Sequence, residues 1–540
     1  MKNILHVFVA VLALSAAADE PILQLRLRMP DVRSDAAWAS TYGIIRENPG
    51  CCDEVWFSTG IGYPPLAVHA ERAERMKRAA EDLRRIGVVP SLQVQATIGH
   101  SDRIGNLEDS SAKDWMGWTS STGLEDRVCS CPRDPKFLAY FREVSKLYAA
   151  FRPGSVWIDD DLRIDGHRPA TDKSRHGCWC ATCIAAFNAE TGGNWTRETL
   201  DKACKDPDLL KKWRAFSIRS LADVARVIAE EMHRHSPETT MALQFCHHEG
   251  AVDKVLAVAR ALHEATGLKV GMRPGGGAYY EIDPKSFVIK SMTSCWFRRR
   301  IGDPDVVGTW CPEVESWPRA YGSRSAQAAI VESFAAFMYG MNATSLLLLD
   351  TRYEKDDLYS RFILKPLAGA APVLKGYAKA NEGTVPVGFA ADGLKPDRLY
   401  RWGLCGVPVL PGVGRKLGDL TKDDLAMDIY TTGSADVQAK RDELDARAGG
   451  MPAVVESPFA GLVLPRVAAD GSLRTVALMN TRIEAQGPVT LRLRGVPASV
   501  SQLTWSELRK SPVTLPVTRE GDVVRVTVPE IAAWNAGYIH

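Results

Sequence analysis

The sequence predicts a (β/α)8 barrel, followed by a small α/β domain and an antiparallel β domain. Three observations support this prediction. Eight short apolar runs lie between residues 22 and 349, amphipathic helical stretches separate them, and the pattern becomes strand-like from residue 461 onward. Strands that alternate with helices are typical of a parallel sheet. A chain of 540 residues is long enough for three or four domains, or for one large barrel with attachments.

Each barrel strand is expected where a β-prone apolar run ends in polar or turn residues. The eight expected strands are Ile22–Leu27, Glu54–Ser58, Val89–Gln95, Ser155–Asp159, Thr240–Phe245, Leu268–Met272, Val306–Trp310 and Thr344–Leu349. The expected helices include Ala70–Ile86, Pro135–Ala150, Leu209–His233, Asp253–Thr266 and Ser325–Tyr339. An open doubly wound sheet is the alternative. No Gly-x-Gly-x-x-Gly follows the first strand, which disfavours the dinucleotide-binding form of that sheet.

The chain divides into four segments by its local pattern. Residues 1–18 form an expected signal peptide and residues 19–380 the barrel. Residues 381–457 mix short apolar segments with helix-compatible polar pieces, which predicts a small α/β domain of flavodoxin-like type. Residues 458–540 carry short β-prone runs such as Val489–Leu493 between Gly and Pro residues, which predicts a β-sandwich.

The N-terminus predicts export. Lys2 precedes an apolar run, Ile4–Leu14, and small residues follow in Ser15–Ala18. A buried strand is the alternative interpretation of this run. No Cys stands at the cleavage point, and no later segment approaches 18 consecutive apolar residues. We therefore expect a secreted or periplasmic protein with no membrane anchor.

The charge balance argues against polyanionic partners. Lys and Arg number 67 and Asp and Glu number 65, a formal net charge of +2. Binding to nucleic acid through the overall field of the protein would need a stronger positive charge. The 14 Trp residues suit stacking on sugar or base faces, although most Trp side chains pack in protein cores.

Three of the 12 cysteines lie within six residues, at Cys178, Cys180 and Cys183. Thiols this close suit convergence on one tetrahedral zinc ion better than three separate disulfides. The candidates for the fourth ligand are Cys129, Cys131, His167 and His176. A disulfide pair with a leftover thiol, or a set of unlinked thiols, is the alternative.

At the ends of two strands several ionisable residues lie close together in the sequence, and barrel enzymes place their active residues at the carboxyl ends of strands. The fourth strand ends in Asp159, Asp160 and Asp161, three adjacent carboxylates that need cations or hydrogen-bond donors nearby. The seventh strand is followed by Glu313 and Glu315, which share one face if the strand continues that far. The alternatives are a solvated helix cap for the aspartates and a surface acid pair for the glutamates.

Acids after the fourth and seventh strands are what glycoside hydrolysis requires. One carboxyl group protonates the departing oxygen, while the other attacks the anomeric carbon or activates water. Close approach of the two raises the pKa of the acid, so that it holds a proton near neutral pH. Trp157, Trp310 and Trp317 flank the two segments.

These motifs resemble those of the family 42 β-galactosidases. In that family the fourth strand ends Ile-Asp-Asn-Glu, whose Glu is the general acid/base, and Cys-x-Cys-x-x-Cys follows; Ile158–Asp161 and Cys178–Cys183 match that order. The family's fourth zinc ligand opens a Cys-Pro segment, with a sugar-binding Arg four residues earlier. Cys131 and Arg127 match those positions. The resemblance thus implies a structural zinc held by Cys131, Cys178, Cys180 and Cys183, and we expect no organic cofactor.

The resemblance also implies roles for the acids, with two departures. Asp161 stands at the family's Glu and Asp160 at its Asn, so either aspartate can be the donor, and Asp161 is the expected one. Glu-Val-Glu replaces a lone Glu, and here Glu315 is the expected nucleophile. The expected substrate-binding residues are Arg127, Asp160, Glu313, Trp310, Trp317, His247 and Arg273.

We therefore expect an exported glycoside hydrolase that removes a β-linked terminal sugar, with galactose as the candidate. The family's α/β domain takes part in trimer contacts, so a homo-oligomer is compatible with the resemblance. A non-catalytic carbohydrate-binding protein on a degenerate barrel is one alternative, because Asp replaces Glu at position 161. A metal-dependent hydrolase that uses His247, His248 and the three aspartates is another.

Overall fold

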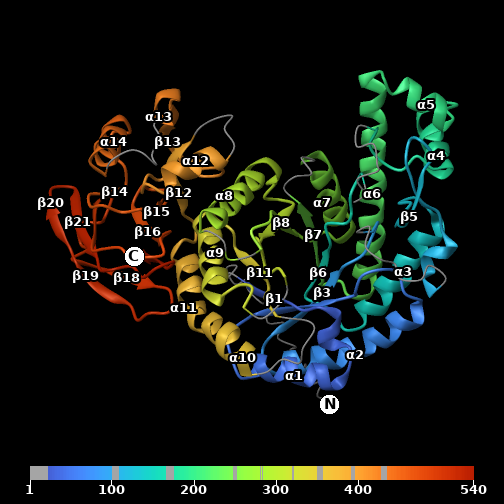
Figure 1. Ribbon diagram of the computed structural model, residues 1–540, viewed down its shortest axis with the longest axis horizontal. Coiled ribbons are helices and arrows are strands. Elements are labelled where there is room, and N and C mark those ends of the chain that lie inside the picture. Colours follow the sequence, from blue (N-terminus) through green and yellow to red (C-terminus); the bar gives the residue numbers. More distant parts are fainter. Residues whose placement is uncertain are drawn as a thin grey trace, which may run out of the picture.

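Figure 1 shows the computed structural model, in which the C-terminal sheets lie beside the barrel. The structure describes residues 22–99, 109–165, 175–246, 252–279, 281, 284–318, 322–349, 357–390, 396–426 and 434–540. The predicted signal peptide lies outside these residues. No helix in the described ranges combines the length and the apolar character that crossing a bilayer requires.

Eight strand positions build the barrel, which confirms the predicted fold class. The parallel sheet has the order β10-β11-β1-β2-β3-β6-β7-β8-β9. Its strands are β1 (Ile22–Arg26), β2 (Glu54–Ser58), β3 (Val89–Val94), β6 (Ser155–Ile158), β7 (Thr240–Cys246), β8 (Val270–Gly275), β9 (Val307–Trp310), β10 (Glu313–Glu315) and β11 (Ala343–Leu347). Each predicted strand overlaps one of these, and β10 continues the seventh.

The seventh strand is broken into two halves, and the ring of strands closes across the break. β9 pairs with β8, and β10 pairs with β11, with Cys311 and Pro312 between them. Proline has no N–H group to donate to a neighbouring strand. Cys311 N instead donates to the Met272 oxygen (3.0 Å), and the Pro312 oxygen accepts from Ser345 N (3.3 Å). These bonds join the break to β8 on one side and to β11 on the other.

The helices of the first 380 residues lie outside the ring of barrel strands (Figure 1). They are α1 (Asp35–Arg46), α2 (Leu66–Arg85), α3 (Pro135–Ala149), α4 (Ala181–Thr191), α5 (Arg197–Ala203), α6 (Pro207–His235), α7 (Val252–Thr266), α8 (Pro284–Ile301), α9 (Ala326–Met338), α10 (Asp357–Tyr359) and α11 (Lys365–Ala380). Capping residues determine where several of these helices begin. Asp134 caps α3 by accepting hydrogen bonds from Lys136 N and Phe137 N, with Pro135 at the first helical position.

A hairpin in the segment after β3 carries part of the predicted metal site. Its strands are β4 (Gly117–Thr119) and β5 (Glu125–Ser130), and neither was expected from the sequence. Cys131 follows β5 directly. Short helical turns, Met29–Val32 after β1 and Ser111–Asp114 before β4, complete this end of the barrel.

Two further sheets form the C-terminal part, and their antiparallel strands confirm the predicted β domain. One sheet has the order β13-β12-β15-β16-β22-β18-β19, and the other the order β14-β17-β21-β20. The elements are β12 (Val385–Ala390), α12 (Pro396–Gly403), β13 (Arg415–Asp419), α13 (Lys422–Ala426), α14 (Ser434–Arg447), β14 (Ala453–Val455), β15 (Gly461–Val467), β16 (Leu473–Asn480), β17 (Val489–Arg494), β18 (Gln502–Glu507), β19 (Val513–Pro516), β20 (Thr518–Glu520), β21 (Val523–Val528) and β22 (Ala536–Ile539).

The predicted border at residue 457 falls inside a shared structure. β12 lies in the predicted α/β domain, but it pairs antiparallel with β15 of the predicted sandwich. β14 likewise pairs with β17. Strands from both predicted domains therefore make up each sheet, and the structure joins residues 381–457 and 458–540 into one unit.

The C-terminal sheets also contact the barrel helices. The rings of Tyr377 on α11 and Tyr538 on β22 lie 5.1 Å apart between centroids. Gln327 on α9 donates to the Trp534 carbonyl oxygen at 2.8 Å. One buried apolar cluster extends from Leu23 in β1 to Tyr538, so the barrel and the C-terminal unit share a core.

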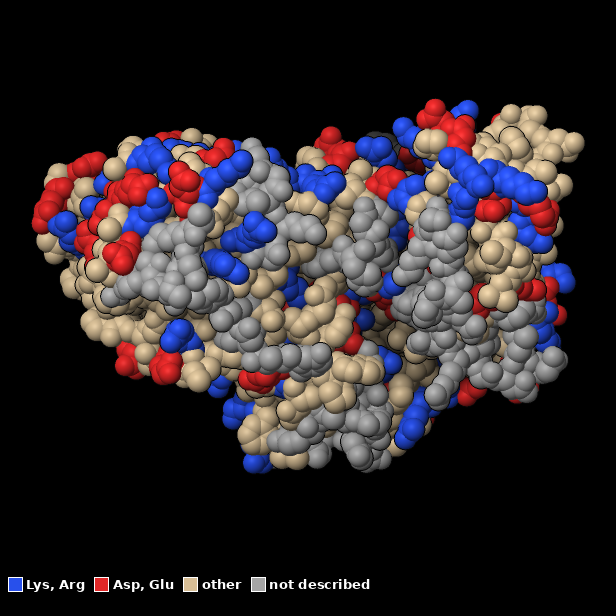
Figure 2. Space-filling view, turned by 45° about the horizontal axis from the view of Figure 1, so that its top comes forward, with Lys and Arg blue, Asp and Glu red and all other residues tan. Residues whose placement is uncertain are grey.

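Acidic and basic side chains are interspersed over the face that Figure 2 shows. Ion pairs also join neighbouring helices, such as that between Arg226 on α6 and Glu264 on α7, whose side-chain atoms lie 3.1 Å apart and whose side chains are 36% and 58% exposed. Exposed pairs of this kind contribute about 0–1 kcal/mol to stability.

His69 on α2 is buried beside two tyrosines. Its ring nitrogens form hydrogen bonds with the Tyr148 and Tyr140 hydroxyls at 2.9 and 2.8 Å. Burial, followed by the charge of Arg72, lowers the pKa of His69 from 6.5 to about 4. The unfolded chain therefore takes up a proton as the pH falls through 6.5, while the folded protein does so only near pH 4.

We expect the free energy of unfolding to fall by up to about 3 kcal/mol at this site as the pH drops from about 7 to about 4. Urea denaturation at a series of pH values measures this loss. In His69→Gln, which keeps hydrogen-bonding groups but has no titrating ring, the loss should be smaller by that amount. An equal loss in the variant would assign the pH dependence to other groups.

Candidate active site

An open pocket of about 410 Å³ lies at the carboxyl ends of the barrel strands. Its lining residues come from the ends of the strands or the loops that follow them. They are Arg26, Arg28, Ile61, Gln95, Asp159, Asp160, Arg273, Tyr279, Glu313, Glu315 and Trp317. The volume is in the range of small-molecule sites. The structure thus places acids from the fourth and seventh strand positions around one space.

Arg273, in β8, links the acids of these two strand positions. Its side chain is 1% exposed and forms an ion pair with Glu313. Its Nη2 lies 3.5 Å from Asp159 Oδ1, and its Nε donates to Gln244 Oε1 at 2.7 Å. Burial lowers the pKa of Arg273, but the charges of Glu313, Asp160 and Asp159 outweigh burial and hold it above its ordinary value. A permanently charged guanidinium therefore holds carboxylates from both sides of the pocket.

Glu313 is held by three side chains. The Tyr279 hydroxyl donates to Oε2 at 2.7 Å, Arg273 contacts Oε1, and Arg26 Nη1 lies 3.6 Å from Oε1. Burial, followed by the charge of Glu313, raises the pKa of Tyr279, so its hydroxyl stays a donor at neutral pH. Gly275 allows this close packing, because a Cβ there would lie 2.8 Å from both Glu313 Oε2 and Arg273 Nη1.

Glu315 lines the same pocket two residues further along β10. Residues two apart on a strand face the same side, and Arg26 Nη1 contacts both glutamates, at 3.5 Å from Glu315 Oε2. Arg324 Nη1 donates to the Glu315 carbonyl oxygen at 2.8 Å, which fixes the backbone at the end of the strand.

The three aspartates after β6 have different positions. Asp161 is fully buried, and its carboxylate accepts hydrogen bonds from Thr97 N and Thr97 Oγ1, each at 2.6 Å, and from Gly99 N at 2.9 Å. These bonds tie the loop after β3 to the loop after β6, and Asp161 is not among the residues that line the pocket. Asp159 and Asp160 line it, and the Asp160 side chain is 14% exposed.

Asp160 contacts a cation and a thiol. Arg163 Nη2 lies 3.3 Å from its Oδ1, and the Cys246 thiol donates to its Oδ2 at 2.6 Å. Burial, followed by the charge of Asp160, raises the pKa of Cys246, so this side chain remains a thiol at neutral pH.

The three tryptophans that flank the acids are in different environments. Trp317 lines the pocket and is 49% exposed, which offers an aromatic face to a ligand in the pocket. Trp310 is 3% exposed and packs in the core, away from its expected role in substrate binding. Trp157 stacks on Trp56 inside the barrel, with 4.3 Å between the ring centroids.

Two of the expected substrate-binding side chains are not among those that the structure describes. Arg127 belongs to β5, but its side chain is outside the described part of the chain. His247 and the neighbouring His248 also lie outside the described residues.

Four thiols converge next to the loop after β6. The sulfur atoms of Cys131, Cys178, Cys180 and Cys183 all lie within 4.8 Å of one another, and all four residues are buried. Cys131 Sγ lies 3.4 Å from Cys180 Sγ and 3.6 Å from Cys183 Sγ. Sulfur atoms around a tetrahedral zinc ion, with bonds of about 2.3 Å, are about 3.8 Å apart. The donor set and its spacing therefore fit a structural zinc ion.

Of the remaining candidates for the fourth ligand, His167 lies outside the described residues, and Cys129 and His176 have other partners. The Cys129 thiol donates to the Gly99 carbonyl oxygen at 3.6 Å, and His176 Nδ1 lies 3.1 Å from Asp165 Oδ1. Hydrogen bonds from the other three thiols lower the pKa of Cys180, whereas burial and the neighbouring thiols raise the pKa of Cys178 and Cys183.

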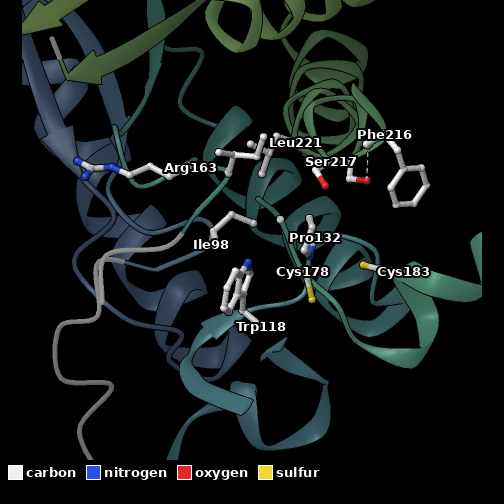
Figure 3. Close-up of a pocket in the computed structure, with 12 residues that line it drawn as sticks. Ile98, Trp118, Pro132, Arg163, Cys178, Cys183, Phe216, Ser217 and Leu221 are labelled. Carbon is white, nitrogen blue, oxygen red and sulfur yellow. Dashed lines mark hydrogen bonds between the residues drawn. The ribbon is translucent and has the colours of Figure 1, made fainter. Parts of the chain in front are cut away.

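A narrow cavity lies between the thiol cluster and α6. Figure 3 shows Cys178 and Cys183 at this cavity, together with Trp118, Phe216 and Ser217. Its free volume of about 10 Å³ is close to the minimum for a single water molecule. The cavity is a packing gap, too small for a sugar.

Four residues at the site were not expected there from the sequence: Arg26, Gln95, Tyr279 and Cys246. For Arg26 a signal existed, because Gln24 and Arg26 alternate with apolar residues in the first strand. In a barrel, polar residues at such a spacing point to the interior. Tyr279 follows a Gly-rich loop, and no spacing in the sequence connects it with Glu313.

No protein-family model matches the sequence, and no curated protein matches it. Solved structures do match. A catalytic mutant of a family 42 β-galactosidase from G. stearothermophilus superposes with a TM-score of 0.60 at 10% identity, covering 97% of this chain and 98% of that one. The β-galactosidase from the haloarchaeon Halorubrum lacusprofundi gives 0.54 at 11% identity, covering 96% and 99%. That from Bacillus circulans sp. alkalophilus gives 0.53 at 10%, covering 94% and 99%.

These similarities extend over the barrel and the C-terminal sheets alike, because each covers at least 94% of this chain. At sequence identities of 10–11% these similarities show the fold alone, and the chemistry depends on the residues of the pocket. The fold of this chain is that of the family 42 β-galactosidases.

Proposed function

We propose that the protein is a glycoside hydrolase that removes a β-linked terminal sugar, with galactose as the candidate. The observation that carries the proposal is one pocket of about 410 Å³ lined by acids from the fourth and seventh strand positions, with Trp317 beside them. Glycoside hydrolysis needs two carboxyl groups on either side of the scissile bond. The shared fold with β-galactosidases supports the same proposal.

Asp160 replaces Asp161 as the proton donor in this proposal. The Asp161 carboxylate accepts three hydrogen bonds from Thr97 and Gly99 and does not line the pocket. Asp160 does line it and is partly exposed there. A general acid must reach the oxygen that it protonates, and position therefore favours Asp160.

Glu315 remains the proposed nucleophile, with Glu313 as an anchor. Both Glu313 oxygens are engaged, one by Arg273 and the other by Tyr279, so this carboxylate orients the cation that also contacts Asp159. In the first step a Glu315 oxygen attacks the anomeric carbon, and the bond to the departing oxygen breaks as Asp160 gives that oxygen its proton. In the second step the Asp160 carboxylate takes a proton from water, which displaces Glu315 and releases the sugar.

A panel of aryl β-glycosides tests the activity, and Asp160→Asn tests the donor. We expect a p-nitrophenyl β-galactoside to be hydrolysed. The variant should lose most activity on substrates with a poor leaving group, but much less on a dinitrophenyl glycoside, because a good leaving group needs no proton. Asp161→Asn is the matched control, which should lower stability without this dependence on the leaving group. A uniform loss across leaving groups in Asp160→Asn would refute the assignment.

Sugar binding without hydrolysis is the second candidate. The burial of Asp161 favours it, because this residue stands at the position of the family's general acid and does not reach the pocket. Calorimetry would then show galactose binding, while no glycoside of the panel would release product.

We also propose that the four clustered cysteines hold a structural zinc ion. It would join the end of β5 to the N-terminus of α4, since Cys131 follows β5 and Cys180 caps α4. Four thiolates fill a tetrahedral ion, so the zinc would brace this loop and leave no position for a water.

We expect zinc removal or Cys180→Ser to lower the melting temperature by at least about 5 °C. Elemental analysis should give one zinc per chain. Cys204→Ser, at a buried cysteine outside the cluster, is the control and should keep the zinc. If a chelator instead abolished activity at once without unfolding the protein, and added metal restored it, that result would favour a metal-dependent reaction.

A further inference from the structure

The fifth barrel strand ends in a thiol that contacts the proposed proton donor. Cys246 is the last residue of β7, which pairs in parallel with β6, the strand that Asp160 follows. The thiol donates to Asp160 Oδ2 at 2.6 Å. Arg163 Nη2 lies 3.3 Å from Asp160 Oδ1 and 3.2 Å from Cys246 Sγ. The three side chains form a closed triangle of contacts at the edge of the pocket.

We propose that Cys246 is a positioning residue that holds the Asp160 carboxyl group in the orientation for proton transfer. The role rests on the proposed function, in which Asp160 is the donor. The contact between the thiol and the carboxylate does not depend on it.

Two partners fix the plane of the Asp160 carboxyl group. Arg163 contacts one oxygen and Cys246 the other, so rotation of the group would break both contacts. Proton transfer depends on placement within hydrogen-bond distance of the acceptor, so a fixed carboxyl plane favours it.

The contact with the thiol also affects the pH at which the Asp160 carboxyl group loses its proton. A donor that faces a carboxylate favours its charged form, as do the cations Arg163 from the same loop and Arg273 from β8. The neighbouring carboxylate of Asp159 opposes them. Loss of the thiol donor should therefore make Asp160 keep its proton to a higher pH.

A thiol suits this role because it does not ionise here. Burial raises the pKa of Cys246, and the charge of Asp160 raises it further. The S–H group therefore remains a donor over the pH range in which Asp160 changes charge.

The first test compares Cys246→Ala with Cys246→Ser, using kcat/KM for an aryl β-galactoside as a function of pH. In Cys246→Ala we expect the alkaline limb to move up by on the order of 0.5–1 pH unit, with a lower kcat. Cys246→Ser keeps a donor and should restore the limb. Cys405→Ala is the matched control, because Cys405 is also half-buried but lines a different pocket from the one that Asp160 lines. An unchanged limb in Cys246→Ala would overturn the proposal.

The second test needs no activity. Iodoacetamide labelling, followed by mass spectrometry, gives the alkylation rate of each cysteine. In Asp160→Asn the negative charge beside Cys246 is gone, so its labelling should be several-fold faster, while Cys405 keeps its rate. An unchanged Cys246 rate would overturn the contact. Faster labelling in a protein that hydrolyses no glycoside would support the contact and refute the proposed function.

Discussion

Glu315→Gln is expected to lower kcat on an aryl β-galactoside at least about a thousandfold. The amide has the shape of the carboxylate but cannot form the glycosyl-enzyme bond. Sugar binding should persist, because Arg26, Trp317 and Asp160 still line the pocket. Steady-state kinetics and calorimetry with galactose measure the two effects separately.

Covalent labelling decides which glutamate reacts. A 2-deoxy-2-fluoro galactoside with a good leaving group should trap the intermediate on the peptide that contains Glu315. Glu313→Gln is the control from the same strand. We expect it to weaken the hold on Arg273 and Tyr279, and so to raise KM while still allowing the label to form. A label on Glu313 would exchange the roles of the two residues.

Glu332→Gln is expected to lower the free energy of unfolding by about 3–5 kcal/mol. Glu332, on α9, is fully buried and forms ion pairs with two cations, Lys290 at 3.1 Å and Arg324. Both partners are at most 1% exposed. Removal of the one negative charge would leave two positive charges buried without compensation, which costs more than the pair contributed.

The control for Glu332→Gln is Glu264→Gln, which breaks the exposed pair with Arg226 and should change stability by less than about 1 kcal/mol. Urea denaturation of both variants gives the comparison. Equal effects would show that the buried ion pairs contribute no more than surface ones. Activity should fall as well in Glu332→Gln, because Arg324 also binds the Glu315 carbonyl oxygen.

The barrel could be predicted because each of its strands has a strong local pattern. Glu54–Ser58, for example, was predicted with the bounds that the structure gives, since an apolar run is enclosed by charged and turn residues. The break between β9 and β10 could be expected less well, because it depends on how Pro312 meets β11. The hairpin β4–β5 has strands too short for a periodic signal.

In the C-terminal half, strand pairing crosses the predicted border at residue 457. The α/β pattern of residues 381–457 is real, since β12 and β13 are parallel and helices accompany them. Which sheet those strands join is decided by pairing with β15, over 70 residues away from β12, and local pattern carries no information about that choice.

In the candidate site, too, some features could be predicted from the sequence and others could not. The positions of the acids at two strand ends follow from the sequence, and so does the spacing of Cys178, Cys180 and Cys183. The direction of each side chain in Asp159-Asp160-Asp161 does not, because it depends on the donors that the loop after β3 presents to Asp161. Trp310 was expected in the pocket for its residue type alone, and the packing of the barrel with its helices placed it in the core.

The order of strands in the larger C-terminal sheet makes the last few residues indispensable. β22 is formed by Ala536–Ile539 and runs between β16 and β18, in the interior of that sheet. A premature stop codon just before Ala536 would remove an interior strand of the sheet, not an edge strand. It would separate β18 and β19 from the rest of the sheet and create two unprotected strand edges, which are sites for aggregation. Loss of these few residues should therefore destabilise the protein as much as the deletion of a central barrel strand.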